Sequence, residues 1–365
     1  MPATKQTVRL PRQPDGDALY LHFTGGVRAA KVGADAWRIE PVLIDGAPCI
    51  IGPLTQEELQ SLVATHNLQA VAFHSIGWTD GCYNSNWKPI IPGRENHVCG
   101  PADLWRNISS NYSRKRTAKH FADQPPRDLQ EAAEALDDRE PEEALAQYVS
   151  LSLRSMDVSV GQIMKYYHEQ LVNLMALEKI EGELTATMRD QILFAHVHSF
   201  FLHLGTARDY LAALIAKRIR LDHARVDSMA RLVERLRQPQ LPADGLLDCL
   251  LSSGYIAPHP EKQGKFAVAG WMEEVTRTRN EIVHNRPYGS KFSERHGQVC
   301  SEDSGTGIYR YSRSFKMNDG TNGDVLDVIQ HHYSRCASFF QQAAERSGYD
   351  ISMMNITDTD VIAVE

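Results

Sequence analysis

The chain lacks any long apolar run and any apolar leader at its N-terminus. No stretch approaches the ~18 consecutive apolar residues that mark a transmembrane helix, and residues 1–20 contain no hydrophobic segment of the kind that a secretory signal carries. We therefore expect a cytoplasmic protein that does not engage a membrane.

Paired cysteines are also lacking. The six cysteines are scattered, at Cys49, Cys82, Cys99, Cys249, Cys300 and Cys336. Unpaired spacing of this kind is typical of reduced thiols in a reducing compartment. A zinc site formed by Cys82, His97 and Cys99 is an alternative, but the spacing is not that of a zinc knuckle, and Cys49 alone stands out as a fourth ligand. We expect no metal and no cofactor.

Positive charge is not in excess. The 365 residues carry a formal net charge of −7, with 42% hydrophobic and 23% charged residues. These are ordinary globular values, and the length favours two domains. An acidic chain is not a general nucleic-acid coat, so any contact with nucleic acid needs a local basic patch.

The order of patterns along the chain predicts an α+β fold. A small mixed or β-rich domain over residues 1–105 precedes a charged connecting segment at 106–145, a helical bundle at 146–350 and a tail at 351–365. Thr55 is the expected N-cap of a short helix in the first domain. A hairpin is expected near 307–317. Helical periodicity places the later helices near residues 147–180, 187–220, 223–238, 243–254, 266–285 and 323–347.

The segment 266–289 carries the most informative pattern. On a helix, Arg279 falls in the middle of an apolar stripe, where an unpaired charge would cost on the order of several kcal/mol. It must therefore have a buried acid, or lie at the floor of a cleft or at a subunit interface. Asn280 and His284 are four residues apart and share one helix face, just before the helix ends ahead of Pro287.

A histidine beside an arginine and an amide suits RNA cleavage without a metal. The histidine can move the proton of a ribose 2′-OH or of the leaving oxygen. The arginine can stabilise the charge on the transition state.

The run Arg279-Asn280-Glu281-Ile282-Val283-His284 resembles the R-x(4–6)-H motif of the HEPN superfamily. The helical segment 191–219 is similar to a HEPN core helix, and the segment 324–347 is similar to a closing helix. The resemblance implies that Arg279 and His284 are the catalytic pair and that Asn280 orients the site. It also implies a homodimer that cuts RNA without metal and leaves a cyclic phosphate.

The expected function is a metal-independent HEPN-type endoribonuclease that acts on RNA in bacterial stress response or phage defence, as a toxin or antiviral effector. By the same resemblance, an antitoxin or an activating partner would control it. The alternative is a non-catalytic HEPN-like module that binds a nucleotide or a protein partner, because some members of the superfamily have lost activity.

Further basic residues are candidates for RNA contact. Arg208 lies on the apolar side of its helix, where it is a second cleft arginine or pairs with an acid such as Glu169. The other candidates follow the motif or belong to the run at 114–116, which is either an RNA contact or a solvated linker: Arg286, Lys291, Arg295, Arg310, Arg313, Arg114, Lys115 and Arg116.

Overall fold

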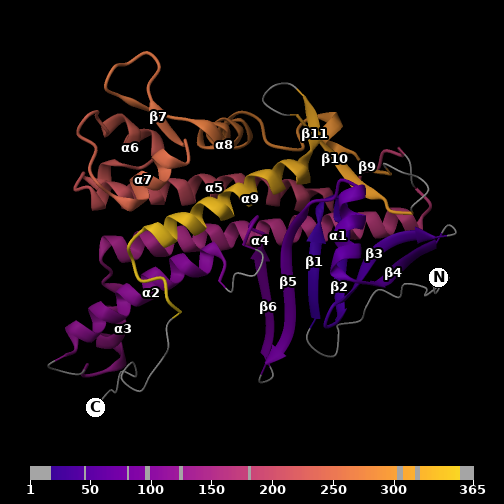
Figure 1. Cartoon of the computed structure of the whole chain (residues 1–365), viewed down its shortest axis with the longest axis horizontal. Helices are drawn as coiled ribbons and strands as arrows, with labels where there is room; N and C mark the ends of the chain where they lie inside the picture. The colour runs from indigo at the N-terminus through magenta and orange to yellow at the C-terminus, as the bar shows by residue number, and fades with distance from the viewer. Residues whose placement is uncertain are drawn as a thin grey trace. The chain divides into compact units, whose positions relative to one another are not determined.

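A computed structural model describes residues 18–44, 47–79, 82–94, 99–122, 126–179, 182–301, 307–316 and 321–353. The fold is mixed α+β. An antiparallel sheet of six strands comes from the first part of the chain, and the α-helices found in the described residues, nine in number, lie mostly later in it (Figure 1).

The chain divides into two compact units, each assembled from separate stretches of sequence. The first unit combines residues 1–96, 157–200 and 280–335, and the second combines 97–156, 201–279 and 336–365. Three helices, α4 (Pro141–Ala176), α5 (Asp190–Arg218) and α9 (Val325–Arg346), contribute residues to both units.

The six-stranded sheet belongs to the first unit. Its order is β4-β3-β2-β1-β5-β6, and every neighbouring pair is antiparallel. Between β4 and β5 lies α1 (Gln56–Thr65), whose expected N-cap is confirmed because Thr55 and Glu58 form a capping box. The strands are β1 (Ala18–Phe23), β2 (Arg28–Gly33), β3 (Ala36–Ile44), β4 (Ala47–Leu54), β5 (Ala70–Thr79) and β6 (Cys82–Pro89).

Two contacts connect this sheet to helices of the same unit. Gly26, in the turn after β1, lies so close to α4 that a Cβ atom would be 2.6 Å from the carbonyl oxygen of Tyr167, so this position requires glycine. At one edge of the sheet, Trp87 of β6 donates a hydrogen bond to the Tyr333 hydroxyl (3.0 Å). That hydroxyl donates to Asp157 (2.6 Å). The sheet thereby contacts both α4 and α9.

A second, smaller sheet in the first unit has the order β11-β10-β9, with β9 at Gly297–Cys300, β10 at Arg310–Lys316 and β11 at Asn322–Asp324. The hairpin expected within 307–317 is instead a single strand, β10, because its pairing partners are β9 before it and β11 after it.

On the inner side of this small sheet, Arg313 of β10 is buried. It forms an ion pair with Asp190 (2.6 Å) and donates to the hydroxyls of Tyr311 (2.8 Å) and Tyr166 (2.9 Å). Tyr166 in turn donates to Asp190 (2.6 Å). The charge is therefore stabilised by partners from three separate segments of the chain.

The second unit is mainly helical. Trp105 donates to the carbonyl oxygen of Phe340 (3.0 Å), and Ser150 donates to that of Ala102 (2.7 Å), so α2, α4 and α9 are in contact within this unit. Its further elements are α2 (Pro101–His120), α3 (Leu129–Asp137), α6 (Met229–Arg235), α7 (Gly245–Ser252), β7 (Ile256–Pro258), β8 (Phe266–Val268) and α8 (Gly270–Asn280).

Two stretches of the second unit differ from the expected local structure. The segment expected to connect two domains, 106–145, lies largely within α2, α3 and the start of α4, and the Arg116–Glu143 ion pair (2.8 Å) stabilises it around a buried carboxylate. The helix expected from residue 266 begins at Gly270, because Phe266–Val268 pairs with β7 as a short hairpin.

None of the helices in the described part of the chain is long and apolar enough to cross a membrane.

The buried Arg313 generates a prediction about stability. Arg313→Ala leaves the Asp190 carboxylate buried without its cation, so we expect a loss of about 3–5 kcal/mol in the free energy of unfolding, measured by urea denaturation. Arg189→Ala is the matched control, because its ion pair with Glu169 has the same 2.6 Å distance but its side chain is 53% exposed. The control should lose less than about 1 kcal/mol. Equal losses in the two variants would contradict the assignment.

Candidate active site

The motif segment lies where a regular helix changes into an irregular turn. Helix α8 ends at Asn280, and Glu281–Asn285 form a π-helical turn. Arg286 is extended, as a residue before proline prefers, and it ends the turn. Single π-turns of this kind are frequent at functional sites. The boundary between the two compact units falls between Arg279 and Asn280.

On the second-unit side, Arg279 is partly buried against α5. A Cβ atom at Gly205 would lie 3.1 Å from the Nε atom of Arg279, so the glycine makes room for the guanidinium. Met272 and Val275, which precede Arg279 on α8, are buried. The apolar surroundings expected for Arg279 are therefore confirmed for this part of the helix.

Arg208 lies on the same α5 segment and is 5% exposed. It donates to Asp209 (3.1 Å) and to Thr276. The expected pairing with Glu169 is wrong, because Glu169 forms its ion pair with Arg189 (2.6 Å). A local acid and a hydroxyl thus satisfy Arg208 inside the unit, and its guanidinium is not presented to RNA.

On the first-unit side, Asn280 and His284 are both exposed. Behind the turn, Arg286 forms ion pairs with Glu281 (3.5 Å) and with the buried Glu294 (2.7 Å). The hydrogen bond from Asn285 lowers the pKa of the Glu281 carboxyl, and Arg286 lowers it further. These contacts hold the end of the turn while the amide and the imidazole remain open to solvent.

The remaining RNA-contact candidates divide into surface and interior residues. Arg295 is exposed and Lys291 is half-buried, close in sequence to His284. Arg313 is buried, and Arg310 is held by both carboxylate oxygens of Asp327 (2.9 and 2.7 Å), so neither is a free surface cation.

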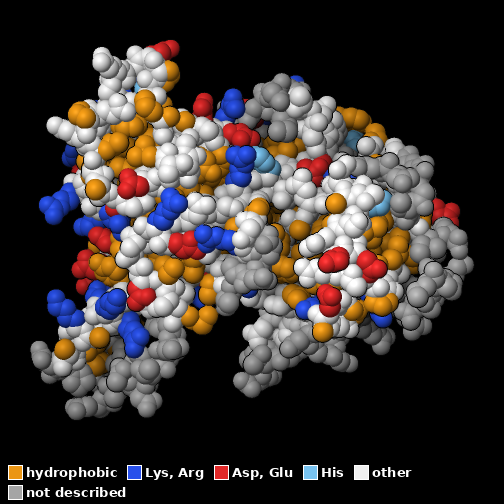
Figure 2. Space-filling view, viewed as in Figure 1, with side chains coloured by type: hydrophobic (Ala, Val, Ile, Leu, Met, Phe, Trp, Pro, Cys, Tyr) orange, Lys and Arg blue, Asp and Glu red, His pale blue; other side chains and the backbone are white. Residues whose placement is uncertain are grey.

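The basic run at 114–116 belongs to the second unit. Arg116 pairs with the buried Glu143 (2.8 Å), and Lys115 approaches Asp350 (3.6 Å) on the surface. Arg114 is half-buried. On the face that Figure 2 shows, Lys and Arg side chains are interspersed with Asp and Glu.

The zinc alternative involves residues of which little is described. Cys49 is buried and Cys99 is half-buried. His97 and the side chain of Cys82 lie outside the described residues.

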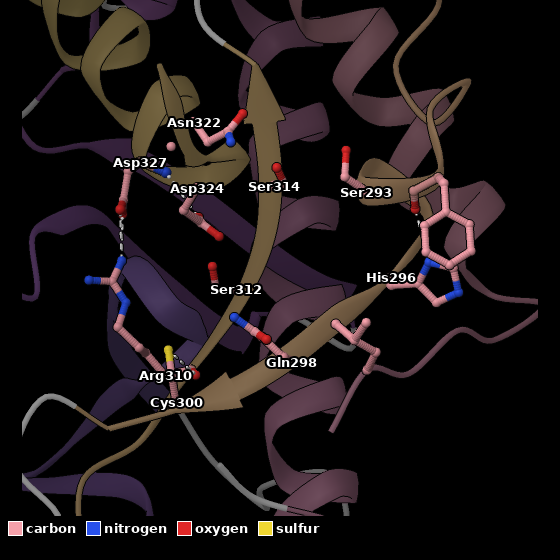
Figure 3. Close-up of a pocket in the computed structure, with 13 residues that line it drawn as sticks. Ser293, His296, Gln298, Cys300, Arg310, Ser312, Ser314, Asn322, Asp324 and Asp327 are labelled. Atoms are coloured by element: carbon pink, nitrogen blue, oxygen red, sulfur yellow. Dashed lines mark hydrogen bonds and ion pairs between the residues drawn. The ribbon is translucent and has the colours of Figure 1, made fainter. Parts of the chain in front are cut away.

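A polar pocket that sequence reasoning did not find lies on the outer face of the small sheet (Figure 3). It has a volume of about 590 Å³. Along β10, Ser312 and Ser314 face the pocket, while Tyr311, Arg313 and Phe315 between and beyond them are buried. The alternation of residue types in RYSRSFK, residues 310–316, was the sequence signal for this pocket. Its second arginine, Arg313, lies on the buried face, so the pattern did not show which face of the strand is polar.

At the edge of this pocket, Asp324 is a buried carboxyl at the start of α9. It accepts hydrogen bonds from the backbone amides of Arg313 (2.7 Å) and Leu326 (2.8 Å) and from the Tyr167 hydroxyl (3.1 Å). Burial, and to a smaller extent the nearby Asp327 carboxylate, raise the pKa of Asp324 to about 6 against the lowering effect of its hydrogen-bond donors. Asp324 therefore titrates in the weakly acidic range.

Comparison of the chain with protein-family models, with curated proteins and with solved structures gives no match.

The raised pKa of Asp324 predicts a pH-dependent stability. An unfolded aspartate ionises near pH ~3.9, so the folded chain binds more protons between about pH 4 and 6. Its stability therefore falls as the pH rises through this window and then levels off. Relative to Asp324→Asn, wild type should lose on the order of 2–3 kcal/mol across the window in urea denaturation.

Asp222→Asn, at a side chain that is 52% exposed, serves as the control and should follow the wild-type profile. Parallel wild-type and Asp324→Asn profiles would refute the buried-acid interpretation.

Proposed function

We propose that the chain is a metal-independent endoribonuclease of the HEPN type, with Arg279, Asn280 and His284 as its active residues. The observation that carries the proposal is the exposure of Asn280, at the end of α8, and of His284, in the π-turn that follows it. Solvent reaches both side chains, so a phosphodiester can also approach them. A histidine buried in the core would have excluded this function.

The proposed reaction is attack of a ribose 2′ oxygen on the adjacent phosphorus. The 2′-O–P bond forms as the P–O5′ bond breaks, which leaves a 2′,3′-cyclic phosphate and a 5′-hydroxyl. His284 makes one of the two proton transfers, either from the 2′-hydroxyl or to the departing 5′ oxygen, and water makes the other. Arg279 stabilises the negative charge on the phosphoryl oxygens, and Asn280 orients the phosphodiester.

The HEPN resemblance extends the proposal to assembly and role. A homodimer would bring two copies of the motif to one RNA cleft. The biological setting would be bacterial stress response or phage defence, with an antitoxin or an activating partner as the control. The six-stranded sheet of residues 18–89 would then serve as a sensor or a docking surface for that partner.

A second candidate function is a non-catalytic module that binds a nucleotide or a partner. The polar pocket of Figure 3 favours it, because hydroxyl and amide groups converge there beside Asp324. A binding module would use this pocket, and substitution of His284 would leave its function unchanged.

The proposed ribonuclease is tested by cleavage of total cellular RNA with purified protein in EDTA. His284→Ala should lower the cleavage rate by about 10²-fold or more, because it removes the group that transfers the proton. Arg279→Ala should lower it by a similar factor through loss of charge stabilisation.

His296→Ala provides a matched control, because His296 lines the pocket of Figure 3 and not the motif turn. This variant should cleave at the wild-type rate. Loss of cleavage in His296→Ala with full activity in His284→Ala would move the active site to the pocket and refute the motif assignment.

A further inference from the structure

A second pocket lies directly beyond the motif turn, entirely within the first unit. It has a volume of about 750 Å³ and is lined by the first turns of α5 and by the loop that starts at Pro287. Pro287 is three residues after His284, so the chain between them spans at most about 10 Å. A nucleotide next to the one at His284 is therefore within reach of this pocket.

The aromatic part of the pocket is Phe194, which is half-buried. Tyr288 packs edge-on against it, with ring centroids 5.7 Å apart, and the buried Arg313 guanidinium lies 5.9 Å from its centroid. Gly289 has φ +90°, and a Cβ atom there would lie 2.7 Å from the Phe194 ring. Glycine thus lets the backbone of this loop pack directly against part of the ring, and the part of half-buried Phe194 that stays accessible lines the pocket.

The polar part of the pocket has an unsatisfied group. The Nε2 atom of His198 is buried and has no hydrogen-bond partner among the residues that the structure describes. His198 lines the pocket, so a turn of its imidazole toward a ligand there would supply the missing hydrogen bond, since a neutral imidazole nitrogen is a donor or an acceptor according to its tautomer. Both donors and acceptors occur on the edges of nucleobases.

The charges around the pocket suit an anionic chain that carries such a base. Asp190 is part of the wall, but its carboxylate is paired with Arg313 (2.6 Å). Arg295 is exposed at the rim, where its Nε donates to the carbonyl oxygen of Gly289 (2.9 Å). The negative charge of Asp190 in the wall is therefore neutralised, and Arg295 places a positive charge at the rim.

We propose that this pocket binds a nucleobase of the RNA next to the scissile phosphate, with Phe194 for stacking and His198 for the base edge. The proposal rests on the ribonuclease function proposed for His284. Stacking on an aromatic ring accepts any base, whereas the hydrogen bond at His198 discriminates among bases. The pocket would therefore strengthen binding and select the nucleotide beside the cut.

Binding is measured with a fluorescein-labelled 12-mer RNA of mixed sequence and full-length protein carrying His284→Ala, which keeps the RNA intact. In this background, Phe194→Leu should weaken binding about tenfold in fluorescence anisotropy. Phe292→Leu is the matched control, because Phe292 is 73% exposed and lines the other pocket, and it should bind like the parent.

His198→Leu separates recognition from packing. It removes a buried nitrogen without a partner, so thermal unfolding should occur at the parent temperature or above it, while RNA binding weakens. In protein with an intact His284, the same substitution should reduce the base preference at the nucleotide beside the cut. Mapped cleavage sites report that preference.

The outcomes distinguish the two proposals. If wild type cuts RNA but Phe194→Leu and His198→Leu change neither binding nor base preference, the nucleobase pocket is refuted and the ribonuclease stands. If wild type does not cut but both substitutions weaken binding, the pocket stands and the ribonuclease falls. If wild type neither cuts nor binds RNA, both proposals fall.

Discussion

The first compact unit depends on one buried cation. Arg313 has no solvent around it, so its charge must be compensated from within, and Asp190, Tyr166 and Tyr311 do this. Its partners come from α5, α4 and β10. Asp190 and Tyr166 each lie more than a hundred residues from Arg313 in the sequence. Because removal of either charge would leave the other buried alone, the network holds the small sheet against the two long helices.

The same network gives two buried carboxyls opposite behaviour. Burial opposes ionisation of Asp190, but hydrogen bonds from Arg313, Tyr166 and Thr187 lower its pKa overall. Asp324 accepts a hydrogen bond from the backbone amide of Arg313 and not from its guanidinium. Burial raises the pKa of Asp324, which is about 6. One acid is thus a permanent ion-pair partner, and the other is able to change charge near neutral pH.

The network also separates two pockets that open on different sides of it. The pocket beyond the motif turn has Asp190 in its wall, and the pocket of Figure 3 has Asp324. Because Arg313 neutralises the charge of Asp190, the pocket beyond the motif turn can accept an anionic polymer.

Local patterns in the sequence predicted the local structure well. Helical periodicity located α4, α5 and α9 to within several residues at their ends, and the N-cap at Thr55 was predicted from its residue type. The start of α8 was misplaced because a two-strand hairpin, which depends on pairing with β7, precedes it.

Long-range contacts could not be predicted from the sequence. The assembly of each unit from separate stretches depends on contacts such as the one from Trp87 to Tyr333, which periodicity does not reveal. Arg313 was interpreted as a surface cation for RNA, because its acid partner lies 123 residues away in sequence. The helix end near His284 was predictable from local sequence, because Pro287 stops the helix, whereas the exposure of Asn280 and His284 is known only from the structure.

The central claim is that RNA is cut by its own 2′-hydroxyl with help from His284. The most direct test uses an oligoribonucleotide with a single mapped cleavage site and its copy with a 2′-deoxy sugar at that nucleotide only. The account predicts that the deoxy substitution abolishes cleavage at this bond and that the unmodified RNA yields a 2′,3′-cyclic phosphate. Cleavage of the deoxy copy at the same bond would contradict it, because the attacking nucleophile would then have to be water.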